Sequence, residues 1–278
     1  MLHLKGVIAA VAAAVACLAA ASSAFAGVAL YTSTDVPRFV PDGGDIPSTL
    51  TVPAGRTAIQ SIDVTNYGYS WFASGQELSA QLFAPDGTSM NLFEIGCFSS
   101  PDNASFTLTD SAATPLPEKN GCDDVNLVGT SFRPVDSQNR KLSLFAGRTA
   151  SGTWTLHSID NSAVFTNQGS LERWALRITH VPPVLKASAP KASKLGALTL
   201  TATANANGTI VTGGGAKPGK TALVADKPKA IPYRVTKKVK QKIKKKGKAR
   251  ANVSLAFTDE TGGTDARNVS VTIKGSAK

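Results

Sequence analysis

Strict alternation of apolar and polar residues in short segments is the feature that most constrains the fold of this chain. In GTWTLHSI, Trp154 and Leu156 point to one face, and the residues between and beside them point to the other. The segment ERWALRI at 172–178 alternates in the same way. Successive side chains of a β-strand lie on opposite faces, so this pattern is typical of half-buried antiparallel strands.

Further segments of the first half follow the same rule. Leu78, Ala80 and Leu82 share one face of ELSAQLF. Leu142 and Leu144 are expected to share one face of a strand in KLSLF. Turn sequences rich in proline, aspartate and glycine separate these segments, and no long helical pattern appears. Many short strands with frequent turns predict an all-β fold, a β-sandwich or jelly roll.

The second half alternates in LTLTATA, NVSLAF and NVSVTI, and residues 259–263 are predicted to turn the last two segments into a hairpin. The basic stretch RVTKKVKQKIKKKGKA lies before this hairpin. Its Val235, Val239 and Ile243 share one helical face, and Gly247 suits a helix end, but the same three residues also have strand parity. This half is predicted to be a small immunoglobulin-like β-sandwich with a short basic helix or strand.

The N-terminus has the organisation of a secretory signal peptide. Lys5 supplies a positive charge, residues 7–21 are apolar, and Ala24-Phe25-Ala26 is a cleavage signal of the A-x-A kind. We therefore expect residues 1–26 to be removed and the mature chain to begin at Gly27, secreted or at the cell surface. A retained membrane anchor is disfavoured because the apolar run is short for a span. No later segment is apolar enough to cross a membrane.

Export gives the cysteines a structural interpretation. Cys17 leaves with the signal peptide, so the mature chain keeps Cys97 and Cys122. Two cysteines in an exported chain favour one disulfide, and closing a loop of this size would contribute about 3 kcal/mol. No histidine is suitably placed beside either cysteine in the sequence, which disfavours a reactive thiol or a Cys/His metal site.

The charge is divided unevenly between the two halves. Residues 27–185 hold 9 Lys and Arg against 15 Asp and Glu, a net charge of −6, whereas residues 186–278 hold 20 against 4, a net charge of +16. Such a split indicates two units with different surfaces. The proline-, alanine- and lysine-rich sequence near residues 181–196 has linker composition. We therefore predict domains at 27–181 and 197–278, joined by a linker at 182–196.

The first half resembles the P domain, also called P/Homo B, which follows the catalytic domain in kexin- and furin-like convertases and in bacterial secreted subtilases. GTWTLHSIDNSAVFTNQGSLERWALRI at 152–178 resembles its most diagnostic block, G-T-W-x-L-x-V-x-D followed by G-x-L-x-x-W-x-L-x-I. DVPRFVPDGG, ELSAQLFAPDGTSMNLF and FTLTDSAATPLPE resemble earlier blocks. The resemblance implies a jelly-roll-like β-sandwich in which Trp154 and Trp174 are core residues. KKVKQKIKKKGKARANVSLAFTDETGG is similar to the lysine-rich Ig-like modules that end many actinobacterial exported proteins.

The stretch Gly87-Thr88-Ser89-Met90 raises the question of serine protease activity, because subtilisin-like proteases carry their nucleophile in G-T-S-M-A. A serine nucleophile needs a general base and a residue that orients the base. His3 leaves with the signal peptide, His157 points away from the Trp154 face, and His180 ends a strand. No sequence resembles the subtilase boxes that carry the acid and base. We therefore predict a hairpin turn with an exposed Ser89 and no enzymatic activity.

Three carboxylates fall at acidic positions of the P-domain pattern, and the resemblance makes them candidate Ca²⁺ ligands: Glu77, Asp110 and Asp160. A hard cation requires several oxygen ligands. The alternative, which the sequence favours, is that they accept hydrogen bonds from backbone N–H groups at turns and strand ends. No other cofactor is predicted.

The lysine run predicts a polyanion-binding surface. Export argues against nucleic acid, so a cell-wall polyanion is the expected partner, and a merely solvated charged face is the alternative. The cations are Lys237, Lys238, Lys240, Lys242, Lys244, Lys245, Lys246, Lys248 and Arg250.

Together these features predict an exported, non-catalytic protein that binds or stabilises a partner at the cell surface or outside the cell. The alternative is an accessory or remnant of a secreted subtilisin-like serine endopeptidase, acting with a protease domain in trans. Function inferred from a fold is associational, so both hypotheses need the structure of the site.

Overall fold

The computed structural model describes residues 24–71, 78–94, 104–117, 127–161, 169–189, 193–195 and 198–275. It confirms the predicted all-β class, and in the described ranges the strands are accompanied by one α-helix, α2 (Lys237–Lys246), and one 3₁₀ helix, η1 (Leu142–Phe145). The chain divides into two compact units: Ala26–Val181 forms the first, and Pro182–Lys278 together with the chain up to Phe25 forms the second. No helix in the described ranges is long and apolar enough to cross a membrane.

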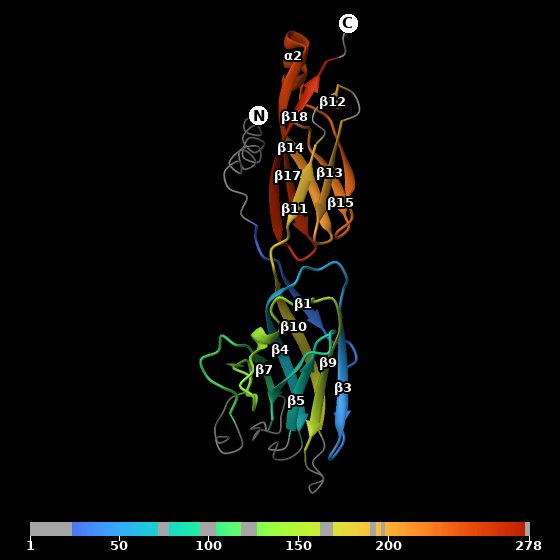
Figure 1. Cartoon of the computed structure of the whole chain (residues 1–278). Helices are drawn as coiled ribbons and strands as arrows, with labels where there is room; N and C mark the ends of the chain where they lie inside the picture. The colour runs from blue at the N-terminus through green and yellow to red at the C-terminus, as the bar shows by residue number, and fades with distance from the viewer. Residues whose placement is uncertain are drawn as a thin grey trace, which may run out of the picture. The chain divides into compact units, whose positions relative to one another are not determined.

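The first unit contains two sheets (Figure 1). One has the order β1-β10-β4-β7-β8, with β2 also paired to β10, and the other has the order β3-β9-β5-β6. Neighbours are antiparallel except β7 and β8, which are parallel. The strands are β1 (Val28–Thr32), β2 (Arg38–Val40), β3 (Asp45–Val52), β4 (Ile59–Trp71), β5 (Leu78–Phe83), β6 (Ser89–Phe93), β7 (Ala104–Leu108), β8 (Ser131–Phe132), β9 (Gly152–Asp160) and β10 (Gly169–His180).

The predicted alternation sets which side chains form the core of the first unit. Trp154 on β9 and Trp174 on β10 are fully buried, as are Leu156 and Leu176 two residues further along each strand. The indole N–H of Trp174 donates to the Ser48 hydroxyl at 2.7 Å. A buried indole requires such a partner, so Trp174 is held by packing and by a hydrogen bond together.

The segment KLSLF, predicted as a strand, forms η1 instead. Leu142 is buried, but the chain turns because the N–H of Leu144 donates to the carbonyl of Lys141. The carboxylate of Asp110 accepts the backbone N–H groups of Leu142 and Ser143, each at 2.8 Å. Satisfying these N–H groups stabilises the helical turn, and a five-residue pattern could not show this distant partner.

The second unit also contains two sheets, in the orders β11-β13-β16 and β12-β18-β17-β14-β15. β12 and β18 are parallel, and the other neighbours are antiparallel. The buried residues of this unit form a cluster of their own, which shares no residue with the core of the first unit. The strands are β11 (Leu185–Ser188), β12 (Ser193–Lys194), β13 (Leu198–Ala204), β14 (Gly208–Gly214), β15 (Gly219–Leu223), β16 (Lys229–Tyr233), β17 (Lys248–Asp259) and β18 (Thr264–Lys274).

The range 182–196, predicted as a linker, contains β11 and β12, so it belongs to the folded second unit. Leu185 is buried, its N–H donates to the Asp265 carboxylate at 2.8 Å, and its carbonyl accepts from Arg267 at 2.9 Å. At the N-terminus, residues 1–23 of the predicted signal peptide lie outside the described residues. Phe25 forms a backbone bridge with Thr264, a pairing that a chain beginning at Gly27 lacks.

Candidate polyanion-binding surface

The lysine run folds as the amphipathic helix α2, which settles the helix-or-strand alternative. Val239 and Ile243, one turn apart, are buried against the core of the second unit. Gly247 adopts the left-handed conformation with φ 68°, and its N–H donates to the carbonyl of Ile243 at 2.8 Å. A glycine in this conformation is a common end for a helix, because it has no Cβ to clash.

The helix carries its lysines on two flanks. Successive residues are about 100° apart around a helix. With Val239 and Ile243 facing the core, Gln241 therefore lies on the crest that faces away from it. Seven lysines of α2 are exposed. Lys237, Lys240 and Lys244 follow one flank at helical spacing, Lys238, Lys242 and Lys245 follow the other, and Lys246 completes the last turn.

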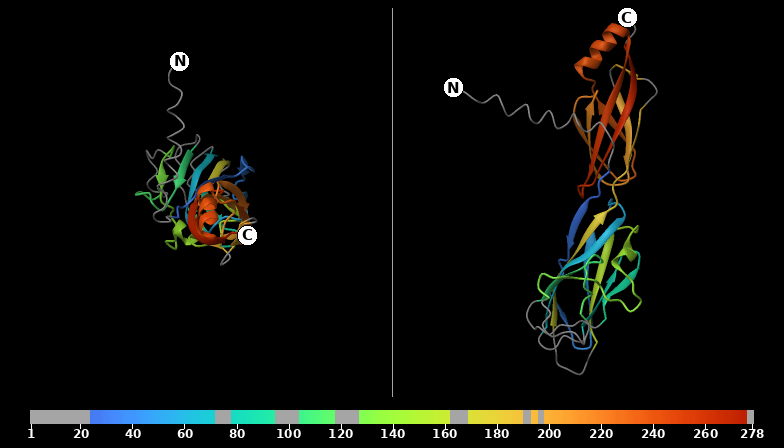
Figure 2. Two further views of the ribbon diagram at one scale, coloured as in Figure 1. Left: turned by 90° about the horizontal axis from the view of Figure 1, so that it is seen from above. Right: turned by 90° about the vertical axis from the view of Figure 1, so that its left-hand side faces the viewer.

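Strand pairing adds a cation that the sequence analysis missed. α2 leads through Gly247 directly into β17, which pairs with β18. In this register Lys248 lies directly opposite Lys274, and both are exposed. The N–H of Gly275 donates to the carbonyl of Gly247 at 2.7 Å, which fixes the end of β18 beside the end of the helix. Figure 2 shows α2 at the same end of the unit as the C-terminal end of β18.

We define the lysine surface as the nine predicted cations together with Lys274. All ten residues are exposed, and in the described part of the chain none of them forms an ion pair. Residues 237–250 contain no acidic residue. Lysines in the last turn of a helix interact favourably with its dipole, but ten neighbouring cations still produce a strongly positive local potential.

Ser89 lies in a β-hairpin and lacks the surroundings that a serine nucleophile requires. It is the first residue of β6, directly opposite Phe83 on β5, in the predicted hairpin. It is half-buried, so the prediction of an exposed Ser89 is wrong. Its carbonyl oxygen accepts a hydrogen bond from the guanidinium of Arg140 at 3.0 Å. This interaction uses the backbone of Ser89 and gives its hydroxyl no base.

The two described histidines are engaged elsewhere. His157 contacts the carboxylate of Asp45 on β3, with Nδ1 2.8 Å from Oδ2. His180 is fully buried, where its Nε2 lies 3.1 Å from the Tyr31 hydroxyl and its Nδ1 lies 3.1 Å from the Thr57 carbonyl oxygen. These interactions place each histidine in its own local network.

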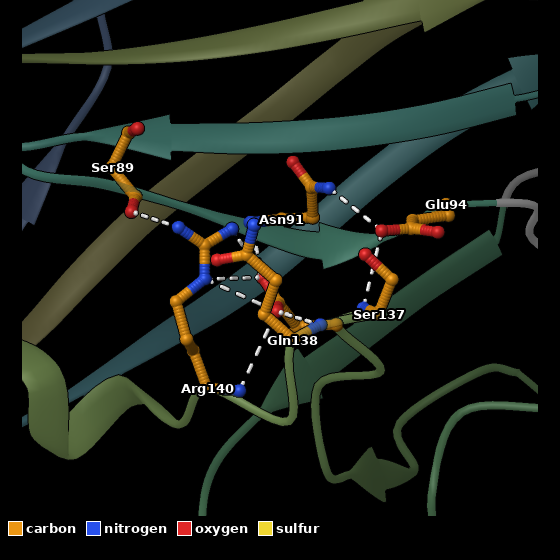
Figure 3. A network of polar contacts seen from close by, with 7 residues as sticks. Ser89, Asn91, Glu94, Ser137, Gln138 and Arg140 are labelled. Atoms are coloured by element: carbon orange, nitrogen blue, oxygen red, sulfur yellow. Dashed lines mark hydrogen bonds and ion pairs between the residues drawn. The ribbon is translucent and has the colours of Figure 1, made fainter.

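A polar network of the first unit includes Ser89, Asn91 and Arg140 (Figure 3), and Asp136 is its common acceptor. The Asp136 carboxylate is buried and accepts from the guanidinium of Arg140 at 2.7 Å. Partial burial raises the pKa of Asp136, but hydrogen bonds from the Arg140 side chain and from backbone N–H groups outweigh it and lower the pKa. The backbone N–H groups of Asn91 and Gln138 also donate to Asp136. Glu94 accepts from the side-chain amide of Asn91 and from the N–H of Ser137. The network fastens the segment after β8 to β6, which is a structural role.

The candidate Ca²⁺ ligands do not form a site in the described part of the chain. Both carboxylate oxygens of Asp110 accept backbone N–H groups at the start of η1. Asp160 is buried at the end of β9, and Glu77 lies outside the described residues. The described residues contain no group of three His, Cys, Asp or Glu side chains that could hold a metal ion. The predicted disulfide partners, Cys97 and Cys122, also lie outside the described residues.

Comparison with known proteins does not identify a family. No protein-family model matches the sequence, and no curated protein gives a significant match. Among solved structures, the serine protease of Aeromonas sobria matches 55% of this chain and 26% of its own, at 17% identity and a TM-score of 0.33. The complex of this protease with its chaperone matches over the same shares at 18% identity and a TM-score of 0.31. The adhesin domain of Epf from Streptococcus pyogenes matches 92% of this chain and 99% of its own, at 8% identity and a TM-score of 0.27.

This chain therefore spans about a quarter of the length of the two Aeromonas structures. TM-scores of this size do not establish a shared fold, so the functional argument depends on the residues of this chain.

Proposed function

We propose that this chain is an exported, non-catalytic binding protein whose second unit holds polyanions at the cell surface or outside the cell. The observation that carries the proposal is the lysine surface itself, in which ten exposed cations lie together without an ion pair in the described ranges. Val239 and Ile243 fix the helix to the core, so the cations are held on a rigid element. A rigid array loses less conformational freedom on binding than a disordered basic tail does.

The arrangement also has a cost in the unbound protein, which argues against a role in solubility alone. Like charges directly opposite each other on paired strands are destabilising, and Lys248 and Lys274 are such a pair. Cations interspersed with acids give solubility without this repulsion. A bound polyanion would neutralise the charges and release condensed counterions.

The resemblance of the first unit to the P domain supports a second candidate partner, a protease domain acting in trans. The specific observation is that both halves of the most diagnostic block form buried core strands, β9 and β10, as a P-domain sandwich requires. These residues support the fold and do not form a catalytic site. In this candidate function, the chain stabilises a partner and does not hydrolyse peptides.

The polyanion proposal is tested by comparing residues 27–278 with residues 27–181 on immobilised heparin. Each unit has its own core, so the shorter chain keeps the first unit intact. The longer chain is expected to bind at low salt and to elute at a few hundred millimolar, on the order expected for several ion contacts. Elution of both chains at the same salt concentration would contradict the proposal, and co-purification of a protease with residues 27–181 would favour the second candidate.

A further inference from the structure

We infer that the lysine surface binds a flexible linear polymer of phosphodiester groups on a polyol backbone, with the chain lying over both flanks of α2 and continuing onto the β17–β18 pair. This inference rests on the proposed function and names the class of polyanion. Three features of the surface carry it: its convex shape, the residues that it lacks, and its choice of lysine.

The shape of the surface favours a flexible chain. A helix with its side chains is a convex cylinder about 10 Å across. Gln241 lies on its crest, and the two lysine rows lie on opposite flanks. A flat bilayer touches mainly the crest of such a cylinder, whereas a flexible chain can follow both flanks. A ligand that bends over the helix can therefore use both rows.

The residues of the surface disfavour single-stranded nucleic acid and lipid. Proteins that bind single strands stack bases on aromatic side chains, and residues 237–250 contain no aromatic residue. Helices that lie in a membrane interface insert a large apolar face. The large apolar residues of α2, Val239 and Ile243, are buried in the unit and unable to insert. Recognition must therefore come from the charge of the polymer backbone alone.

The choice of lysine fits phosphodiesters in many orientations. Arginine recognises phosphate and carboxylate groups with a planar fork of fixed geometry, whereas lysine is a compact point charge with rotatable donors. Nine of the ten cations are lysines, and Arg250 is the exception. A surface of point charges suits a chain whose anionic groups change orientation as the chain moves.

The strand pair extends the path beyond the helix. The last turn of α2 carries Lys244, Lys245 and Lys246, and Lys248 and Lys274 follow immediately on β17 and β18. The hydrogen bond between Gly275 and Gly247 holds this junction together. A polymer that extends past the end of the helix therefore reaches further cations on the strand pair, which continue the same surface.

The test measures binding of the mature full chain to purified poly(glycerol phosphate) as a function of salt concentration. Heparin, a mixed-sequence DNA duplex and phosphatidylglycerol vesicles are compared at equal anionic charge. Three variants are measured: Lys237, Lys240 and Lys244→Gln for one flank, Lys238, Lys242 and Lys245→Gln for the other, and Lys274→Gln for the strand pair. Glutamine is a good helix former, so α2 is expected to persist, which circular dichroism verifies.

The matched control is Lys220, Lys227 and Lys229→Gln, three exposed lysines of the same unit outside the lysine surface. It removes the same charge as each flank variant. Each flank variant is expected to reduce the slope of log K against log salt by about 2, because each phosphate that a lysine neutralises adds about 0.7 to that slope. Lys274→Gln is expected to reduce the slope by less than about 1, and the control is expected to leave it unchanged.

The inference is confirmed if both flank variants weaken poly(glycerol phosphate) binding and this polymer binds more tightly than the other three ligands. It is overturned if only one flank matters, or if the control has an equal effect. It is also overturned if heparin, the duplex or the vesicles bind more tightly, although polyanion binding then stands. Failure to bind any of the four ligands at low salt overturns the proposed function itself.

Discussion

Lys248 on β17 lies directly opposite Lys274 on β18, and both side chains are exposed at the point where α2 joins the sheet. Directly opposed residues of an antiparallel pair have Cβ atoms about 5 Å apart, so their charges repel. The pair therefore connects the stability of the second unit with its proposed function, because the arrangement that costs stability also increases the positive potential.

Replacing Lys274 with glutamate is expected to stabilise the unbound second unit while weakening polyanion binding. The substitution turns a repulsive cross-strand pair into an attractive one, worth about 0.2–1 kcal/mol. Thermal unfolding at low salt is expected to show a higher Tm for the variant, with a smaller difference at high salt because of screening. A lower Tm at low salt would show that the two lysines do not repel each other appreciably.

The first unit is expected to lose stability in acid partly through Asp136. Its pKa in the folded protein is lowered from 3.8, so its contribution is complete above that value and is lost as the pH falls through the folded pKa. Asp136→Asn is expected to destabilise the unit by about 1–3 kcal/mol at pH 7, because the partly exposed Arg140 loses its charged hydrogen-bond acceptor. The variant should also show a weaker dependence of stability on pH below about 4. An unchanged pH profile would contradict this role.

Asp35 is also expected to contribute stability that is lost in acid. Desolvation raises its pKa, but hydrogen bonds from the hydroxyls of Ser48 and Ser33 and from Thr49 outweigh this effect and hold the pKa at about 2. The stability it contributes is present above the ordinary value of 3.8 and is lost between there and about 2. Asp35→Asn, followed by chemical denaturation at pH 7 and pH 2, is expected to be more destabilising at pH 7 than at pH 2. Equal destabilisation at both values would argue against this linkage.

Ser89 is expected to be unreactive. Its carbonyl bonds to Arg140, and the two described histidines contact Asp45 and the Tyr31–Thr57 pair instead. A fluorophosphonate probe should therefore leave the mature protein unlabelled, and casein should remain intact. Labelling that disappears in Ser89→Ala would show that the serine is a nucleophile after all.

Much of the fold could be predicted because its signals are local. The alternation around Trp154 and Trp174 shows directly which residues face the core, and both are fully buried. The chain also changes from acidic to basic after residue 185, near the division between the two units at Val181 and Pro182. These features depend on residue type and spacing within a single strand or a single stretch of chain.

The errors arose where a distant residue decides the local structure. KLSLF becomes η1 because Asp110, 32 residues earlier, accepts the N–H of Leu142. Leu185 joins a strand because its segment pairs with β13, and Asp265, 80 residues later, accepts its N–H. Neither partner is visible in a local pattern.

The lysine surface shows the same limit. The run 237–248 was evident, and Val239 and Ile243 marked its buried side whether it formed a helix or a strand. Lys274 was missed because only the β17–β18 register brings it opposite Lys248. The weak signal that could have found it is the predicted hairpin at 259–263, since counting equal distances back along both strands pairs these two lysines.

The central claim is that the clustered lysines, and not the net charge of the second unit, bind polyanions. The most direct measurement is the salt concentration at which the mature chain elutes from an immobilised polyanion when Lys244, Lys245 and Lys246 are replaced by glutamine. The control carries the same substitution at Lys220, Lys227 and Lys229, which are also exposed and remove equal charge. We predict that the first variant elutes at clearly lower salt than the wild type, because three cations no longer neutralise the polymer, and that the control elutes with the wild type. Elution of both variants at the same salt concentration would contradict the claim and leave the lysines as a solvated face.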